Sequence, residues 1–98
     1  MRFLITTKVF ETIQNAADLQ RQAKLVDDQI QRIMNSGKMI EGGQFADGRG
    51  HFFLLDVDSE KELLELLNRG ILDSCYIESH PIVSFKDLFE FFKNNPPK

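Results

Sequence analysis

The alternation of apolar and polar positions predicts four strands in this chain. Residues 3–10 (FLITTKVF) and 51–57 (HFFLLDV) are β-rich runs with apolar residues on both faces, as is typical of central strands. Residues 38–45 and 75–83 are two further extended runs. The Gly42-Gly43 pair in the former indicates a β-bulge or a close backbone approach. Pro81 near the end of the latter indicates a sheet edge or a strand terminus.

Residues 15–36 carry a helical period, with apolar residues recurring at steps of four and three. The resulting stripe consists of Leu19, Ala23, Val26, Ile30 and Ile33. Asn15 is a suitable N-cap, and Gly37 is a suitable residue just after the helix end. The pattern therefore predicts an amphipathic helix between the first two strands.

A second helix is predicted after the third strand, because Ser59 and Glu62 have the spacing of a capping box. Its expected buried face consists of Leu63, Leu64, Leu66 and Leu67. Gly70 is expected to end it. Between the second and third strands, Asp47-Gly48 is a strong hairpin signal.

A third helix is predicted after the last strand, with Ser84 as its cap. One face carries Phe85, Leu88, Phe89 and Phe92, and Phe91 lies off that face. So many phenylalanines exceed what a short terminal helix needs for its own packing. This helix is therefore a candidate contact between subunits.

The predicted order is β-α-β-β-α-β followed by a C-terminal helix, which defines an α+β, ferredoxin-like fold with a four-stranded antiparallel sheet. We expect one domain over residues 1–98, with the core in residues 1–83 and the last helix in residues 84–95. Helices on one face would leave the other, apolar face of the sheet exposed. A second copy stacked sheet against sheet would cover it, so the pattern predicts a dimeric α+β barrel, a homodimer or higher oligomer.

Composition narrows the classes of function. The chain has 98 residues, a net charge of −3 and 42% hydrophobic residues. The acidic balance argues against nucleic acid or an anionic membrane as a partner. The N-terminal apolar run is too short for a signal peptide, and no run approaches a membrane span. A single cysteine, Cys75, excludes an intrachain disulfide, and we expect a cytoplasmic protein.

Several stretches resemble the muconolactone isomerase-like family and small uncharacterised relatives in the dimeric α+β barrel superfamily. They are Met1-Arg2-Phe3-Leu4, Gly37-Lys38, Gly48-Arg49-Gly50, the run to Asp56-Val57, Ser59 with Glu62-Leu63 and Leu66-Leu67, and Ile77-Glu78 with Pro81-Ile82. The resemblance spans about residues 1–83 and consists of fold positions. It implies a βαββαβ subunit, self-association and a small pocket between sheet and helices. It also implies proton transfer on a lactone without metal or cofactor, but it carries over no catalytic residue.

Three residues are candidate bases for proton transfer. Glu41 lies within an otherwise apolar strand, where desolvation raises the pKa of a carboxylate; the alternative is an exposed charge on an edge strand. His51 opens the third strand and has the parity of Phe53 and Leu55; the alternative is a hydrogen-bonded histidine at the sheet rim. His80 closes the fourth strand, with a polar strand face as its alternative. Their spacing matches no local metal motif, so a metal is not expected, and the family resemblance implies that no cofactor is needed.

Three further residues are candidate ligand-binding groups. Tyr76 and Glu78 share a strand face with His80 by period two, and the carboxylate could orient the imidazole. Arg49 lies in a hairpin turn, from which it could reach a ligand carboxylate at a pocket rim. Cys75 has no sequence-adjacent basic partner, which favours a buried, inert thiol.

Two functions follow from these patterns. One is a cofactor-independent, isomerase-like enzyme acting on a small organic acid or lactone, with one of the three candidate bases and a cation such as Arg49 or Lys8 in a pocket. The other is a non-catalytic, ligand-binding or structural oligomer, in which those residues face water and apolar side chains fill the barrel.

Overall fold

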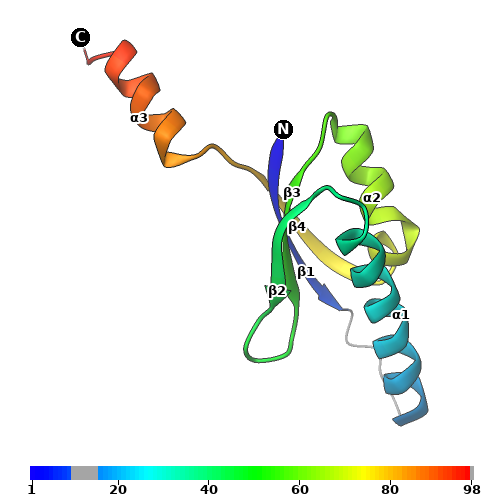
Figure 1. Cartoon of the computed structure of the whole chain (residues 1–98). Coiled ribbons are helices and arrows are strands. Elements are labelled where there is room, and N and C mark those ends of the chain that lie inside the picture. Colours follow the sequence, from blue (N-terminus) through cyan, green and yellow to red (C-terminus); the bar gives the residue numbers. More distant parts are fainter. Residues whose placement is uncertain (10–15, 98) are drawn as a thin grey trace.

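The structure is a computed structural model that describes residues 1–9 and 16–97. Its elements form the order βαββαβα (Figure 1). They are β1 (Arg2–Val9), α1 (Ala16–Met34), β2 (Met39–Gln44), β3 (His51–Asp56), α2 (Glu60–Leu72), β4 (Cys75–Pro81) and α3 (Phe85–Asn94). The predicted element order is therefore confirmed, and the chain has a ferredoxin-like α+β fold. Phe10 and Asn15, placed in a strand and at a helix cap by the sequence patterns, lie outside the described residues.

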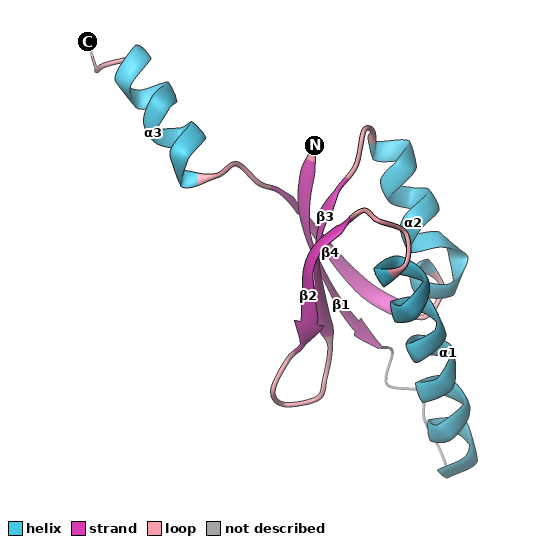
Figure 2. Cartoon of the chain, viewed as in Figure 1, coloured by secondary structure: helices cyan, strands magenta, loops and turns pink. Residues whose placement is uncertain are grey.

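The four strands form one antiparallel sheet in the order β2-β3-β1-β4. The two apolar runs, β1 and β3, are central, and the glycine- and proline-containing strands are the edges. Helices α1 and α2 cover one face of the sheet, whereas the other face carries neither helix (Figure 2). This second surface is called the open face below.

Strand register assigns side chains to the two faces, because directly paired residues in a sheet point the same way. His51 pairs with Thr7, and Phe53 pairs with Ile5, on the helix-covered face. Leu54 pairs with both Leu4 and Glu41, and these side chains belong to the open face.

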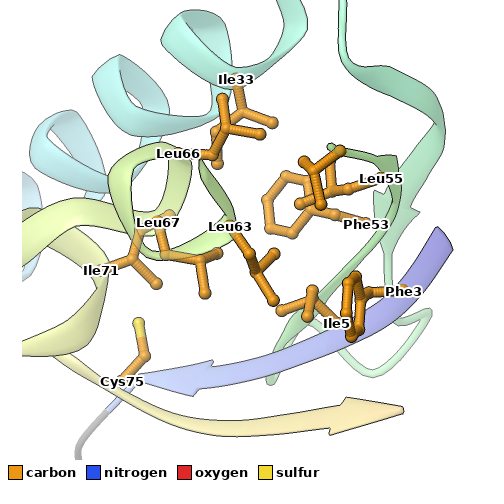
Figure 3. Packing of buried hydrophobic residues seen from close by; sticks show 11 residues of the cluster. Phe3, Ile5, Ile33, Phe53, Leu55, Leu63, Leu66, Leu67, Ile71 and Cys75 are labelled. Carbon is orange, nitrogen blue, oxygen red and sulfur yellow. The ribbon is translucent and has the colours of Figure 1, made fainter. Parts of the chain in front are cut away.

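The core lies between the sheet and its two helices (Figure 3). It consists of Phe3, Ile5, Ile33, Phe53, Leu55, Val57, Leu63, Leu66, Leu67, Ile71 and Cys75. Arg32 links the two helices, since its guanidinium donates to the Leu66 carbonyl. This sandwich fixes where β1 ends and β3 begins relative to the helices, and it thereby positions the candidate site.

Most of the predicted caps and turns are confirmed. The Ser59 hydroxyl accepts a bond from the Glu62 amide at 3.1 Å. The Glu62 carboxylate accepts from the Asp58 amide at 3.2 Å, one residue earlier than the reciprocal bond of an ideal capping box. Gly37 and Gly48 have φ of 76° and 75°, as the end of a helix and a hairpin turn require.

The predicted end of the second helix is wrong. Helix α2 continues past Gly70 to Leu72 and is interrupted at Asn68, whose φ is 42° and ψ −174°. Gly70 has a packing role instead, because a Cβ there would lie 2.6 Å from the Gln29 amide group. Two residues assigned to the apolar faces of the helices are not buried. Leu64 is 56% exposed, and Ala23 is exposed as well.

The irregularity predicted for β2 is present, two residues earlier than expected. The register shifts between Met39 and Glu41, ahead of the glycine pair. The other expectation for the glycine pair, a close approach of neighbouring groups to the backbone, is also met. A Cβ at Gly43 would lie 2.8 Å from the Phe52 ring, and one at Gly42 would lie 2.8 Å from the Met39 sulfur.

Candidate functional site

A cavity of about 260 Å³ lies between α1, the start of β3 and the end of α2. Its apolar wall contains Leu25, Val26, Ile30, Phe53 and Ile71. Its polar groups are Thr7, Arg21, Gln22, Gln29, His51 and Ser74. A mostly apolar hollow with a few polar groups is the usual form of a small-molecule site. The pocket implied by the family resemblance thus has a counterpart between sheet and helices.

His51 connects this cavity with a second one. It is the first residue of β3, and its pairing with Thr7 directs it toward the helices. The second cavity, of about 250 Å³, lies under the other end of α1, and it shares Ile30, His51 and Phe53 with the first. The imidazole therefore lies where the two cavities meet, accessible to a ligand in either.

The surroundings of His51 favour its neutral form. Desolvation lowers the pKa of the imidazole from its ordinary value of 6.5, and the negative charge of Asp27 on α1 opposes this effect more weakly. At neutral pH the ring is therefore largely unprotonated and has a nitrogen lone pair available to accept a proton. A neutral imidazole half-buried beside an apolar wall is suited to act as a general base.

Helix α1 contributes half of the polar lining, and the sequence patterns did not single out these residues. Arg21 can supply a positive charge, and Gln22 and Gln29 supply amides. Asp27 lines the second cavity and acts electrostatically on His51. A detectable signal existed in retrospect. Gln22, Asp27 and Gln29 flank the apolar stripe, and flanking positions line the edge of the contact between a helix and the sheet beneath it, whereas the position of Arg21 on the opposite side gave no such signal.

The interruption in α2 shapes the other end of the cavity. Beyond Asn68 the chain presents Gly70, Ile71 and Ser74 to the cavity. The Asn68 side chain accepts a bond from the Gly70 amide at 2.7 Å, and the Ser74 hydroxyl donates to the Gly70 carbonyl. A straight helix would not place these three residues in the same way.

The other two candidate bases lie on the opposite side of the sheet. Glu41 and His80 are exposed and share the open-face row formed by Leu54 and Leu4. His80 Nε2 lies 3.4 Å from a carboxylate oxygen of Glu78, so the arrangement expected from period two is present. The sheet thus separates Glu41 and His80 from His51, and the three do not form one constellation.

The three candidate ligand-binding residues also lie away from the His51 cavity. Tyr76 and Glu78 border a broad open-face hollow of about 600 Å³, together with Thr6, Lys8 and Phe45. Arg49 is exposed in the β2–β3 turn. Arg21, and not Arg49, is placed to bind a ligand carboxylate, because it lines the same cavity as His51.

Cys75 is buried in the wall of the His51 cavity, and desolvation raises the pKa of its thiol. The predicted burial of Cys75 is confirmed, and a protonated thiol is a poor nucleophile. Among residues 1–9 and 16–97, no group of three or more His, Cys, Asp or Glu side chains could hold a metal ion. No helix in the same part of the chain is long and apolar enough to cross a membrane.

Fold and cavity together define a ferredoxin-like α+β domain with a small pocket between its sheet and helices. No protein-family model matches the sequence, and no curated protein is similar to it. Among solved structures, one similar chain is 5-chloro-2-hydroxyhydroquinone dehydrochlorinase (TftG) from Burkholderia phenoliruptrix AC1100 in complex with 2,5-dihydroxybenzoquinone. The TM-score is 0.66 at 17% identity, over 89% of this chain and 98% of that one. At this identity the similarity establishes the fold.

Proposed function

We propose that this protein binds a small, partly apolar organic acid or lactone in the cavity beneath α1 and moves a proton on it without a cofactor. The observation that carries the proposal is the placement of His51, a desolvated imidazole lining both cavities. The activity would be isomerase-like, as in the muconolactone isomerase-like family that the sequence resembles.

The chemistry requires one acid–base group and one anchor. The neutral His51 ring accepts a proton from a carbon next to a carbonyl, and the resulting imidazolium returns it to a different carbon of the same conjugated system. The double bond moves and no net proton is consumed. Arg21 pairs with a carboxylate of the ligand, and Gln22 and Gln29 donate amide hydrogens to its carbonyl oxygen.

Two observations support a small ring compound as the ligand. A cavity of about 260 Å³ is at the lower end of the range for ligand sites, which fits a single ring better than a larger molecule. The similarly folded TftG was solved with 2,5-dihydroxybenzoquinone bound. Both agree with a substrate class of cyclic acids and lactones.

We also propose that the functional unit is a homodimer stacked through the open face. Leu4 and Leu54 lie at the centre of that face and are already half-buried within one chain. Stacking would remove their remaining apolar surface from water, and it would close a barrel between the two sheets. Tyr76, Glu78 and His80 would then lie in or beside the interface.

Solvent deuterium exchange tests the proton transfer. Muconolactone is incubated with the protein in D₂O, and NMR measures deuterium incorporation at carbon and any double-bond shift. We expect His51→Gln to reduce exchange to the buffer rate, whereas the matched variant His80→Gln retains it. Equal exchange by wild type and His51→Gln would contradict the role of His51.

A non-catalytic binding protein is the second candidate, because among the described residues that line the first cavity His51 alone is suited to accept a proton at neutral pH, and no second acid–base group assists it. In that case ligands bind and shift the His51 resonances, yet no deuterium enters the ligand above the buffer rate. Arg21→Gln separates binding from chemistry, since loss of the anchor is expected to weaken binding of the acid at least tenfold in either case.

A further inference from the structure

Helix α3 has no extensive contact with another helix or strand among residues 1–9 and 16–97. It extends away from the sheet and from the other two helices, and none of its residues is buried (Figure 1). The radius of gyration is 16.5 Å, with extents of 60 × 25 × 18 Å, whereas a compact chain of this length has about 13 Å. The phenylalanine side chains of α3 are 54–77% exposed.

The helix is nevertheless well specified by its sequence. The Ser84 hydroxyl accepts from the Asp87 amide at 3.1 Å, and the Asn95 amide donates to the Phe91 carbonyl at 2.9 Å, so both ends are capped. Phe85 and Phe89 stack with ring centroids 6.0 Å apart. A ten-residue helix is marginal alone in water, so its stability has to come from packing of its apolar face.

The direction of α3 indicates where that packing occurs. The Ile82 amide donates to the Arg2 carbonyl at 3.0 Å, which holds the chain at the sheet until just before the helix begins. From there α3 projects toward the side of the sheet opposite α1 and α2, the side of the open face (Figure 2). One chain therefore has two uncovered features on the same side, a sheet face with Leu4 and Leu54 at its centre and an aromatic helix beyond its end.

We propose that α3 is an exchanged arm that packs its phenylalanine face on a second copy of this chain. In a two-fold dimer stacked through the open face, each arm would extend past the end of its own sheet and reach the other subunit. The symmetry makes the two contacts identical. Arm packing is thus continuous with the sheet interface. This inference rests on the proposed homodimer but not on the ligand chemistry.

The available apolar area is sufficient for a stable contact. Each aromatic side chain carries 150–250 Å², so the exposed fractions in α3 leave on the order of 1,000 Å² on two arms. A standard-size interface buries about 1,600 Å² from both partners together. The two arms alone therefore supply more than half of the area of a standard interface, and a contact between the open faces would add to it.

Light scattering across a dilution series tests the contribution of the arm. We expect a dimer for wild type, and at least a tenfold higher dimer dissociation constant for the double variant Phe89→Ser with Phe92→Ser. The matched control, Glu90→Ser with Asn94→Ser, changes the opposite face of α3 and is expected to leave that constant unchanged. Circular dichroism verifies that the sheet and its covering helices stay folded in both variants.

Exchange between subunits is tested with a spin label on α3, placed by Lys93→Cys in a Cys75→Ser background. Chains that carry the spin label and natural-abundance nitrogen are mixed with ¹⁵N-labelled chains that carry no spin label. We expect the amides of the ¹⁵N-labelled copies to broaden, because the arm of one chain lies on the other.

Three outcomes would overturn the arm proposal. One is an absence of broadening in the ¹⁵N-labelled chains of the mixture, which would mean that the arm does not lie on a second copy. Another is a monomeric wild type at every concentration, which would remove the proposed homodimer as well. The third is an unchanged dimer constant in the phenylalanine variant, in which case the arm proposal fails while the dimer and the ligand site stand.

Discussion

A single imidazole carries most of the chemistry proposed for this protein. His51 lies at the first position of β3, where strand parity directs it toward the helices and the end of the strand leaves it partly open to two cavities. Burial and the Asp27 charge act on its pKa in opposite directions, and burial dominates. The result is a proton acceptor at neutral pH whose basicity depends on how tightly α1 covers it.

The first prediction is a loss of stability on acidification that depends on His51. The folded-state pKa lies below the ordinary 6.5, so the unfolded chain binds more protons in the interval between the two values. Stability from this group is complete above about pH 6.5 and is lost as the pH falls toward the folded-state pKa. Urea denaturation of wild type at pH 7.5 and 5.5 should show that fall.

Two variants isolate the contribution of His51 to that fall. His51→Gln is expected to flatten the dependence on pH in this range, whereas His80→Gln is expected to retain it, because His80 is exposed. The same slope in wild type and His51→Gln would mean that other groups account for the pH dependence.

At the residue scale the sequence predicted the role of strand residues better than that of helix residues. Period two was sufficient to place His51 with Phe53 on one face and His80 with Glu78 on one face. Arg21 and Gln29 were not found, because their nearness to His51 arises from the packing of α1 across the sheet. No local pattern encodes a contact between residues 21 and 51.

Helix α2 shows how an interruption within one element shapes the cavity. Asn68 has a φ of 42°, which is sterically costly for a residue with a Cβ, and its side chain compensates by accepting from the Gly70 amide at 2.7 Å. The interruption turns Ile71 into the core and Ser74 toward the cavity.

The second prediction concerns this interruption. Asn68→Ala keeps the steric cost and removes the side-chain bond, so it should destabilise the fold by about 1–2 kcal/mol. Asn68→Gly also removes the bond but relieves the backbone strain, so its cost should be smaller. The free energies of unfolding from urea titrations compare the two variants. A larger cost for glycine than for alanine would show that the strain at Asn68 is unimportant.

At the element scale the sequence correctly predicted which helices and strands exist and their order along the chain. It was less accurate about where helices end and which of their residues are buried. Caps with a side-chain mechanism were correct, as for Ser59 and Ser84. Gly70 was wrongly predicted to end the helix. The position needs a glycine because the side chain of Gln29, a residue distant in sequence, leaves no space for a Cβ. Leu64 was misassigned because the four leucines occupy a wider arc of α2 than the sheet covers.

Two surfaces of the whole molecule leave apolar side chains uncovered in a single chain, the open face and helix α3. Leu54 and Leu4 lie at the centre of the open face, with Glu41 beside Leu54 on the adjacent strand. Apolar side chains ringed by polar residues are typical of association surfaces. The hydrophobic pattern of the sequence indicated the same surface, because strands with apolar residues on both faces need a packing partner on each face of the sheet.

The third prediction tests that surface. Leu54→Lys places an ammonium group beside Glu41 at the centre of the open face, where water solvates it in the single chain, but a stacked dimer would have to strip that water from a charged group on each subunit. We expect at least a tenfold rise in the dimer dissociation constant by analytical ultracentrifugation. The control Leu64→Lys makes the same change on the exposed side of α2 and should have no effect on association. Equal constants for both variants would exclude the open face as the interface.

The central claim is that a ligand occupies the cavity beside His51, and histidine NMR tests it most directly. The chain has two histidines, so His80→Gln assigns the two ring signals. With 2,5-dihydroxybenzoquinone as the probe, we predict a saturable change in the His51 ring shifts and in its titration midpoint, with His80 unchanged. Saturable binding that moves the His80 signals alone would place the ligand on the open face and contradict the site.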